Sequence, residues 1–353
     1  MKAKRLLAAL LTASAIVSLT ACKGASGSTD NKASAETQES KDSGETITLK
    51  IAHGASETYH LHRALLLFKD VVEETGRFQV EIYPNQQFGS DEEMIQGVKT
   101  GDLTMAVCPT SYLPNDVPSM ALIELPYVFP NRATALATLK SDWGQKELDL
   151  LEDAGLHGLG YLENGMRHIT NSKKEIKTPE DLNGMKFRTM QVEAHVSFFN
   201  SLGASAEGSP FSELYTNLST GVFDGEENPI AHIYANKFYE VQKYITLTEH
   251  VYTAYIPVMK QSFWESLSEE DQKILEDAYR QAYDCQMSLI EEEESAQLQE
   301  MEDYGCVVTH LTEEEKAAFI EAAQPTLEKY RDSLGADVYD AFTAAVEANT
   351  VTE

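Results

Sequence analysis

The sequence predicts an α/β fold built from two similar lobes and followed by a mostly helical tail. Three observations carry this prediction. Hydrophobic patterns typical of a strand, a helix and a strand follow one another over residues 46–83. A second α/β run begins near Arg167, and residues 261–353 have helical character. The length agrees, because 353 residues are enough for roughly two domains.

The first α/β run opens with a strand at 46–53, in which Ile47, Leu49 and Ile51 share one face. Residues 57–75 place hydrophobic side chains at helical spacing, and residues 78–83 alternate again. Strand, helix and strand in this order predict a parallel sheet with a right-handed crossover. The elements expected next are a helix near 90–100, a strand near 103–108, a helix over 132–153 and a short strand at 157–162.

The second run predicts a strand at 185–190 and helices at about 192–202 and 211–220. Thr100-Gly101 and Thr220-Gly221 look related, since each pair ends a helix and an Asp follows shortly afterwards. Glycine suits the left-handed conformation that closes many helices. Such a repeat is what two similar lobes would produce. In the tail, Ser268 and Thr312 stand before acidic residues as helix N-caps, and a strand is expected at 306–310.

The chain is strongly acidic, with 28 Lys+Arg against 57 Asp+Glu and a formal charge of −29. This argues against nucleic acid and anionic membrane surfaces as main partners, because both require a basic footprint. Residues 265–353 alone contain 24 Asp+Glu and 5 Lys+Arg. The acidity is therefore concentrated in the helical tail and does not exclude an acidic ligand.

The N-terminus is typical of an export signal. Lys2, Lys4 and Arg5 precede an apolar run that ends in Leu19-Thr20-Ala21-Cys22, which resembles the bacterial lipobox. We expect residues 1–21 to be a lipoprotein signal peptide, Cys22 to be lipidated and residues 22–45 to form a flexible tether. The alternative is an ordinary signal peptide with an incidental cysteine. In either case the mature protein would be exported, to the outer face of the cell membrane or to the periplasm.

Motifs for catalysis, metals or cofactors are missing from the sequence. It contains no GxSxG, HExxH, P-loop or GxGxxG motif, so no enzyme activity and no cofactor are predicted. Cys108, Cys285 and Cys306 form no CxxC pair and are expected to be buried thiols. His53, His60 and His62 could suggest metal delivery, but a structural or ligand-bonding role is favoured and no metal site is predicted.

Arginine is scarce, and two arginines lie in contexts that suggest a site. Arg167 sits in Gly165-Met166-Arg167-His168, and Arg188 lies on the alternating strand between Phe187 and Thr189. They could be surface charges or members of salt bridges within a lobe. The functional alternative is a carboxylate clamp, because the planar guanidinium meets a carboxylate with two parallel hydrogen bonds.

An exported protein with two α/β lobes has the architecture of bacterial solute-binding proteins, whose ligand lies in the cleft between the lobes. Several motifs occur here in order: Tyr83-Pro84, Leu125-Pro126-Tyr127, Arg188-Thr189-Met190, His195, Leu202-Gly203-Ala204, Asp224-Gly225-Glu226-Glu227-Asn228-Pro229 and Lys237-Phe238-Tyr239-Glu240-Val241-Gln242-Lys243-Tyr244. This set resembles the substrate-binding subunit, of the DctP type, of a tripartite ATP-independent periplasmic (TRAP) transporter. The resemblance covers nearly the whole chain after the tether.

The resemblance implies a role for three residues. Arg188 would be the principal carboxylate ligand through a bidentate salt bridge, Arg167 a second and less direct contact, and Asn228 a hydrogen-bond donor to the ligand. Glu226 stands where the family usually has Gln, and it is expected either to contact the ligand or to be solvent-facing or salt-bridged. An Asn that related sugar-acid binders often carry near position 192 is replaced by Val192.

The resemblance also implies a two-lobe, periplasmic-binding-protein-like fold with a hinge and a long helix, here at roughly 268–299, that crosses both lobes. Lobe I would comprise residues 46–164 plus about 254–293, and lobe II residues 165–253 plus about 294–353. The partners would be small and large integral membrane subunits driven by an ion gradient, and the binding protein would catalyse nothing.

The ligand expected from these residues is a sugar acid such as a hexuronate. His53, Glu57 and His60 follow the first strand, and Thr110, Ser111 and Tyr112 follow the strand at 103–108; these polar groups would suit hydroxyls. A C4-dicarboxylate or other organic acid is the first alternative. A metal- or solute-binding lipoprotein of an ATP-driven importer and a surface enzyme acting on uronic-acid polymers are the others.

Overall fold

Two β-sheets of six strands each organise residues 46–352, the part of the chain that the computed structural model describes. The first sheet contains β1 (Ile47–His53), β2 (Phe78–Tyr83), β3 (Met105–Pro109), β4 (Leu156–Gly158), β5 (Leu162–Met166) and β11 (Tyr252–Lys260). The second contains β6 (His168–Asn171), β7 (Lys186–Thr189), β8 (Ser205–Gly208), β9 (Gly225–Asn228), β10 (Tyr244–Leu247) and β12 (Val307–His310). The α/β class predicted from the sequence is confirmed.

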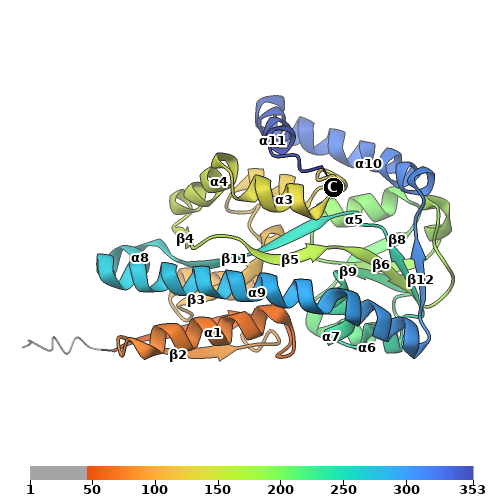
Figure 1. The fold of residues 1–353 in the computed structure, drawn as a ribbon. Coiled ribbons are helices and arrows are strands. Elements are labelled where there is room, and N and C mark those ends of the chain that lie inside the picture. Colours follow the sequence, from red (N-terminus) through yellow and green to blue (C-terminus); the bar gives the residue numbers. More distant parts are fainter. Residues whose placement is uncertain (1–45, 353) are drawn as a thin grey trace, which may run out of the picture. The chain divides into compact units, whose positions relative to one another are not determined.

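Helices surround both sheets (Figure 1). They are α1 (His60–Glu74), α2 (Asp91–Thr100), α3 (Arg132–Leu139), α4 (Asp142–Asp153), α5 (Glu193–Ser201), α6 (Leu214–Ser219), α7 (Ile230–Ala235), α8 (Gln261–Ser266), α9 (Glu269–Tyr304), α10 (Glu313–Leu334) and α11 (Ala336–Ala348). Short 3₁₀ helices at Thr110–Tyr112, Pro118–Glu124 and Phe211–Glu213 follow β3 and β8 and also contribute to the site region.

The first sheet has the strand order β2-β1-β3-β11-β4, with β5 also paired to β11. Strand β1 runs parallel to both β2 and β3, which confirms the predicted β1-α1-β2 unit. Strand β11, however, runs antiparallel to β3 and β4. The sheet is therefore mixed rather than wholly parallel, because the chain returns to it from the second sheet through β11.

The chain crosses between the sheets at two adjacent places. Strand β5 ends at Met166 and β6 begins at His168, so Arg167 alone separates the sheets on the first crossing. The return crossing lies between β10 and β11, and its backbone is bonded to the first: Arg167 N–H donates to Val251 O at 2.8 Å and His250 N–H donates to Arg167 O at 3.2 Å. Arg167 is thus fixed at the junction of the two sheets.

Helix α9 is 36 residues long, which corresponds to about 54 Å at the usual helical rise. The Ser268 side chain caps its first turn by accepting from Asp271 N–H, and Gly305 ends it in the left-handed conformation with φ of 113°. The helix packs against α1 near the first sheet and against α7 near the second (Figure 1). The long crossing helix is confirmed and extends beyond the predicted end at residue 299.

Two predicted elements are each divided in the structure. The helix predicted over 132–153 is two helices, because Ser141 caps a new helix and Gly144 packs so closely on the Leu139 carbonyl that no side chain would fit there. The strand predicted at 157–162 is replaced by β4 and β5, separated by Gly160 with φ of 145°. Both breaks depend on close packing that the hydrophobic pattern does not record. The helix predicted at 211–220 starts as a 3₁₀ turn and becomes α6.

The helical tail is confirmed, including the capping box in which Thr312 and Glu315 bond each other's backbone. Helix α11 packs against α3, where the Phe342 ring lies 5.6 Å from the Phe129 ring and 4.9 Å from that of Trp143. Its neighbours therefore belong to the region of the first sheet, although the predicted lobe II includes residues 294–353. The exact lobe boundaries stay a prediction.

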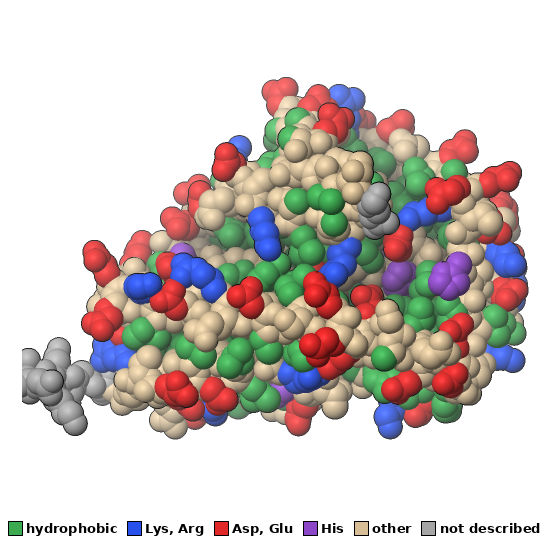
Figure 2. Space-filling view, in the orientation of Figure 1, with side chains coloured by type: hydrophobic (Ala, Val, Ile, Leu, Met, Phe, Trp, Pro, Cys, Tyr) green, Lys and Arg blue, Asp and Glu red, His purple; other side chains and the backbone are tan. Residues whose placement is uncertain are grey.

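Acidic side chains are scattered over the face in Figure 2, including the length of α9, as the composition of the tail leads one to expect. None of the helices within residues 46–352 has the length and apolar character needed to cross a bilayer. The predicted signal peptide, the lipidated Cys22 and the tether lie outside the described residues.

Candidate functional site

A small cavity of about 30 Å³ lies where the two sheets meet. One side is formed by Gly54, Asp91, Pro109, Tyr112, Asn164 and Tyr255 from the first sheet and its connections. The other is formed by Arg167, Arg188, Met190, Phe211, Asn228 and His232. Ligand sites for small molecules usually measure a few hundred Å³. A bound molecule would therefore require the two sides to move apart.

A larger hollow of about 430 Å³ lies elsewhere, between α3, α4 and α9. Its charged side chains are Lys140, Arg280 and Asp284, all of which are exposed. Exposed charges interact weakly with a ligand because water screens them. The small cavity, which has two buried arginines, is thus the stronger candidate despite its size.

Arg188 is a buried cation without a carboxylate partner among the described residues. It lies on β7 and is 1% exposed. Its Nε and Nη2 donate to the carbonyl of Ser209 at 3.1 and 2.6 Å, while Nη1 is buried and makes no hydrogen bond within residues 46–352. Burial lowers the pKa of Arg188. A buried charge of this kind is costly, so the free end of the guanidinium is poised for an anion.

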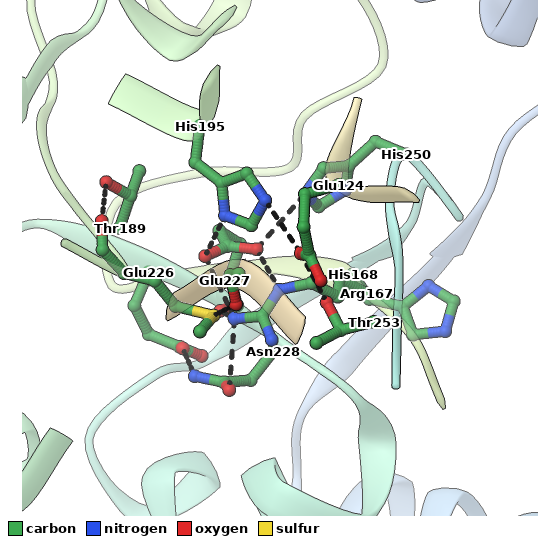
Figure 3. A network of polar contacts seen from close by, with 12 residues as sticks. Glu124, Arg167, His168, Thr189, His195, Glu226, Glu227, Asn228, His250 and Thr253 are labelled. Atoms are coloured by element: carbon green, nitrogen blue, oxygen red, sulfur yellow. Dashed lines mark hydrogen bonds and ion pairs between the residues drawn. The ribbon is translucent and has the colours of Figure 1, made fainter. Parts of the chain in front are cut away.

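Arg167 is buried to the same degree but already has a partner (Figure 3). Its Nε is paired with Glu227, and its Nη2 donates to Glu227 Oε1 at 2.9 Å and to Asn228 Oδ1 at 3.2 Å. Burial alone would lower the pKa of Arg167, but the Glu227 carboxylate raises it. Arg167 therefore forms a salt bridge within the protein, the alternative that the sequence left open, and only its Nη1 is unused by these bonds.

Glu227 is the centre of a buried network that reaches the first sheet (Figure 3). Its Oε2 lies 3.3 Å from His250 Nε2, and its Oε1 lies 3.8 Å from His195 Nδ1. Burial alone would raise the pKa of Glu227, but Arg167 and the two histidines hold it well below its ordinary value. The other ring nitrogen of His195 lies 3.3 Å from Glu124 Oε2. The carboxylates raise the pKa of His195, although burial alone would lower it.

Glu226 lies behind Asn228 and does not line the cavity. It is fully buried, and it accepts hydrogen bonds from Thr170 Oγ1 at 2.7 Å and Asn228 Nδ2 at 2.5 Å. Burial raises the pKa of Glu226 to about 7. It is thus neither solvent-facing nor paired with a cation among the described residues. Its role in this arrangement is to orient the amide of Asn228.

Five of the six polar residues predicted at the ends of the first strands lie outside the cavity lining. His53 bonds His62 at 3.0 Å, and His60 bonds Gln286 beside α9 at 3.1 Å. Glu57 is exposed, whereas Thr110 donates to Glu124 at 2.5 Å.

Ser111 is likewise buried outside the lining, with its hydroxyl 3.9 Å from the Met190 sulfur. Tyr112, which was predicted with them, does line the cavity, and so do Gly54 and Pro109, the chain neighbours of His53 and Thr110. Successive side chains at a strand end point in opposite directions, which accounts for the difference of one position. Contact between the predicted residues and a ligand stays a prediction.

Beyond Gly54 and Pro109, six lining residues were missed as candidate site residues: Asp91, Asn164, Met190, Phe211, His232 and Tyr255. Asp91 begins α2, and burial raises its pKa to about 6. His232 donates to or accepts from the Tyr255 hydroxyl at 2.8 Å and stacks on Tyr59. Asp91 could have been found, since loops after parallel strands meet at one edge. Nothing in the sequence distinguishes His232.

Within residues 46–352, no group of three or more His, Cys, Asp or Glu side chains is arranged to hold a metal ion. Cys108 and Cys306 are buried free thiols, as predicted, whereas the free thiol Cys285 is only half-buried because it lies on the outer part of helix α9. Both ring nitrogens of His53 have protein partners, because Nε2 is bonded to His62 Nδ1 and Nδ1 accepts from Ala55 N–H. These bonds explain why the two rings lie close together.

The chain resembles proteins of known class. Residues 51–333 match the family described as bacterial extracellular solute-binding protein, family 7, or DctP. The sequence is 32% identical over 301 residues to the 2,3-diketo-L-gulonate-binding periplasmic protein of Escherichia coli (strain K12), which covers 85% of this chain and 88% of that protein.

Two solved structures are similar over most of the chain. The sugar acid binding protein DctPAm from Advenella mimigardefordensis, in complex with galactonate, gives a TM-score of 0.83 at 30% identity and covers 86% of this chain and 99% of its own. A TRAP periplasmic solute-binding protein from Shewanella oneidensis with bound succinate gives a TM-score of 0.81 at 28% identity, with coverage of 85% and 99%.

Proposed function

The chain belongs to the DctP family of bacterial extracellular solute-binding proteins, and we propose that it holds a small carboxylate-bearing molecule between its two sheets. Members of this family bind solutes for transport and are not enzymes. The observation that carries the proposal is that Arg188 is buried beside the cavity and that its Nη1 has no hydrogen-bond partner in the part of the chain that the structure describes. A ligand carboxylate would supply the missing negative charge and hydrogen bonds.

The geometry refines the clamp expected from the sequence. The Nε–Nη2 edge of Arg188 faces the Ser209 carbonyl, so a bidentate carboxylate would use the Nη1–Nη2 end. Arg167 is held by Glu227 and would contribute at most through Nη1 and through its charge. Asn228 is held between Arg167 and Glu226, which fixes its amide for a contact with the same ligand oxygen or its neighbour.

A sugar acid, such as a hexuronate or aldonate, is the ligand class that we favour. Asp91, Asn164, His232 and Tyr255 supply polar groups on the cavity beyond the arginines. The Asp91 carboxylate would accept a hydroxyl hydrogen bond but repel a second ligand carboxylate. A C4-dicarboxylate is the second candidate, because a similar structure holds succinate.

Capture would occur by closure of two lobes about the paired crossings at Arg167 and His250. The lobes would comprise residues 46–164 with about 254–293, and residues 165–253 with about 294–353. The small cavity supports this idea, since its walls must separate to admit a ligand. The bound molecule would be delivered to TRAP membrane subunits that use an ion gradient.

We also propose that the mature protein is anchored through a lipid on Cys22. The support is the Leu19-Thr20-Ala21-Cys22 sequence after a basic and apolar leader. Mass spectrometry of protein purified from membranes should find the mature chain beginning with an acylated Cys22. An unmodified cysteine, or cleavage at another site, would contradict the anchor without affecting the ligand site.

A thermal-shift panel tests the proposed ligand class. Galactonate, galacturonate, glucuronate and succinate would be compared with galactose and with divalent cations. A ligand at a hundred times its Kd should stabilise the fold by about 2.7 kcal/mol and raise Tm visibly. We expect a sugar acid to do so and galactose not to. A response to cations alone would favour the metal importer alternative, and turnover of a uronic-acid oligosaccharide would favour the enzyme.

A further inference from the structure

Gln86 connects the two sides of the cavity through its side-chain amide. It lies on the loop between β2 and α2, where its Nε2 donates to Asp91 Oδ2 at 2.9 Å. Its Oε1 accepts from the backbone N–H of Ser212 at 3.1 Å. A carboxylate only accepts and a backbone N–H only donates, so these partners fix the orientation of the amide.

The two partners belong to different halves of the site. Asp91 starts α2, which packs on β3 of the first sheet, and it lines the cavity. Ser212 lies in the 3₁₀ helix after β8 of the second sheet, next to the cavity-lining Phe211. The hydrogen bond from Ser212 to Gln86 can therefore exist only while the two halves are close together.

The loop holds Gln86 in an unfavourable backbone conformation. Asn85 and Gln86 have φ of 57° and 55°, in the left-handed region that residues with side chains rarely adopt. Their backbone N–H groups donate to Ala55 O and His53 O at 3.0 and 3.2 Å. Gly54 lies directly beside both side chains, since a Cβ there would be in van der Waals contact with Gln86 Cγ at 3.4 Å and with Asp91 Oδ1 at 3.5 Å. Strain maintained in this way is typical of functional sites.

We propose that Gln86 is a positioning residue that couples closure of the cleft to the orientation of Asp91. Asp91 lines the cavity, and with Oδ2 bonded to Gln86 its carboxylate would be oriented for a ligand hydroxyl at Oδ1. Closure adds the Ser212 bond and fixes Gln86, which in turn fixes Asp91. This inference rests on the proposed role of the cavity as the ligand site. If this inference is correct, replacing Gln86 should change the dissociation rate of the ligand more than its association rate.

Hydrogen exchange at the Ser212 amide tests the closure bond without any ligand. In Gln86→Ala, the Ser212 N–H loses its acceptor and should exchange about tenfold faster, the usual size for one hydrogen bond. Gln87→Ala is the matched control, because Gln87 is the same residue type in the same loop and is exposed. We expect no change there. Equal Ser212 exchange in wild type and Gln86→Ala would overturn the proposal.

Gln86→Glu separates the two bonds. A glutamate oxygen can still accept from Ser212 N–H, so protection of that amide should persist. The carboxylate would instead repel Asp91, and the dissociation rate of galactonate should rise more at pH 8 than at pH 5.5. Gln87→Glu supplies the same charge as a control. Dissociation rates that match wild type at both pH values would contradict the positioning role.

The two sets of measurements separate this inference from the proposed function. If none of the acids in the thermal-shift panel binds while Ser212 exchange still depends on Gln86, the ligand proposal fails and the closure bond stands. If galactonate binds but Gln86→Ala changes neither exchange nor its dissociation rate, the ligand proposal stands and the role of Gln86 is refuted.

Discussion

Replacing Arg188 by methionine should abolish tight binding without destabilising the ligand-free protein. Methionine has a similar length but no charge, so the cavity keeps much of its shape. Removing one member of a buried, hydrogen-bonded charge pair usually costs about 2–5 kcal/mol of binding free energy. A loss of affinity of at least a hundredfold, or about 2.7 kcal/mol, is therefore expected.

The effect on folding should be small because two terms oppose each other. Arg188→Met leaves the Ser209 carbonyl without its two donors, which costs roughly 1–3 kcal/mol. It also removes a buried cation that lacks a carboxylate partner among the described residues, which relieves several kcal/mol of desolvation, on the order of what a buried ion costs. The ligand-free variant should melt within a few degrees of wild type or above it.

Calorimetric titration with the acid that gives the largest thermal shift would measure the affinity. Arg280→Met is the matched control, since Arg280 is an exposed arginine on α9 whose partners are surface carboxylates. It changes the net charge equally and should leave Kd within about twofold. An Arg188→Met protein that is folded and binds within threefold of wild type would refute the carboxylate role of Arg188.

Three further predictions follow from the buried groups around Arg188. Arg167→Met leaves the Glu227 charge without its main partner and should lower the free energy of unfolding by about 3–5 kcal/mol. In chemical denaturation, the double variant that also carries Glu227→Gln should recover part of that loss. The absence of any recovery would contradict the pairing. Burial raises the pKa of Glu226 to about 7. The protonated carboxyl group therefore contributes to folding stability below the unfolded pKa of Glu226, and this contribution is lost as pH rises through 7. Glu226→Gln should accordingly gain up to about 3 kcal/mol relative to wild type between pH 5 and pH 8, whereas a difference independent of pH would count against this environment. Asp91→Asn removes a cavity carboxylate and should shift the ratio of the galactonate and succinate affinities at least about threefold toward succinate. Paired titrations with the two acids would measure this ratio. An unchanged ratio would exclude Asp91 from ligand discrimination.

The elements that depend on local signals could be predicted from the sequence. Ser268 and Thr312 cap their helices through bonds to residues three positions along, and Gly101 ends α2 with φ of 92°. The β1-α1-β2 unit follows from hydrophobic periodicity alone. These features involve neighbours in the chain, so the sequence contains them directly.

The features that could not be predicted depend on contacts that form only in the folded chain. Arg167 pairs with Glu227, sixty positions away in the chain, and only the fold reveals that this pair uses most of the Arg167 guanidinium. The division at Gly144 depends on its approach to the Leu139 carbonyl. At the first strand, a shift of one position separates His53, which bonds His62, from Gly54, which lines the cavity. Site residues of this kind require the register of side chains, which a hydrophobic pattern fixes only to within one residue.

A crystal structure with the acid selected by the thermal-shift panel would test the central claim most directly. We expect carboxylate oxygens about 3 Å from Arg188 Nη1 and Nη2, with ligand hydroxyls toward Asp91 and with Glu227 still paired to Arg167. A ligand bound away from Arg188, or one whose carboxylate is held only by Arg167, would contradict it.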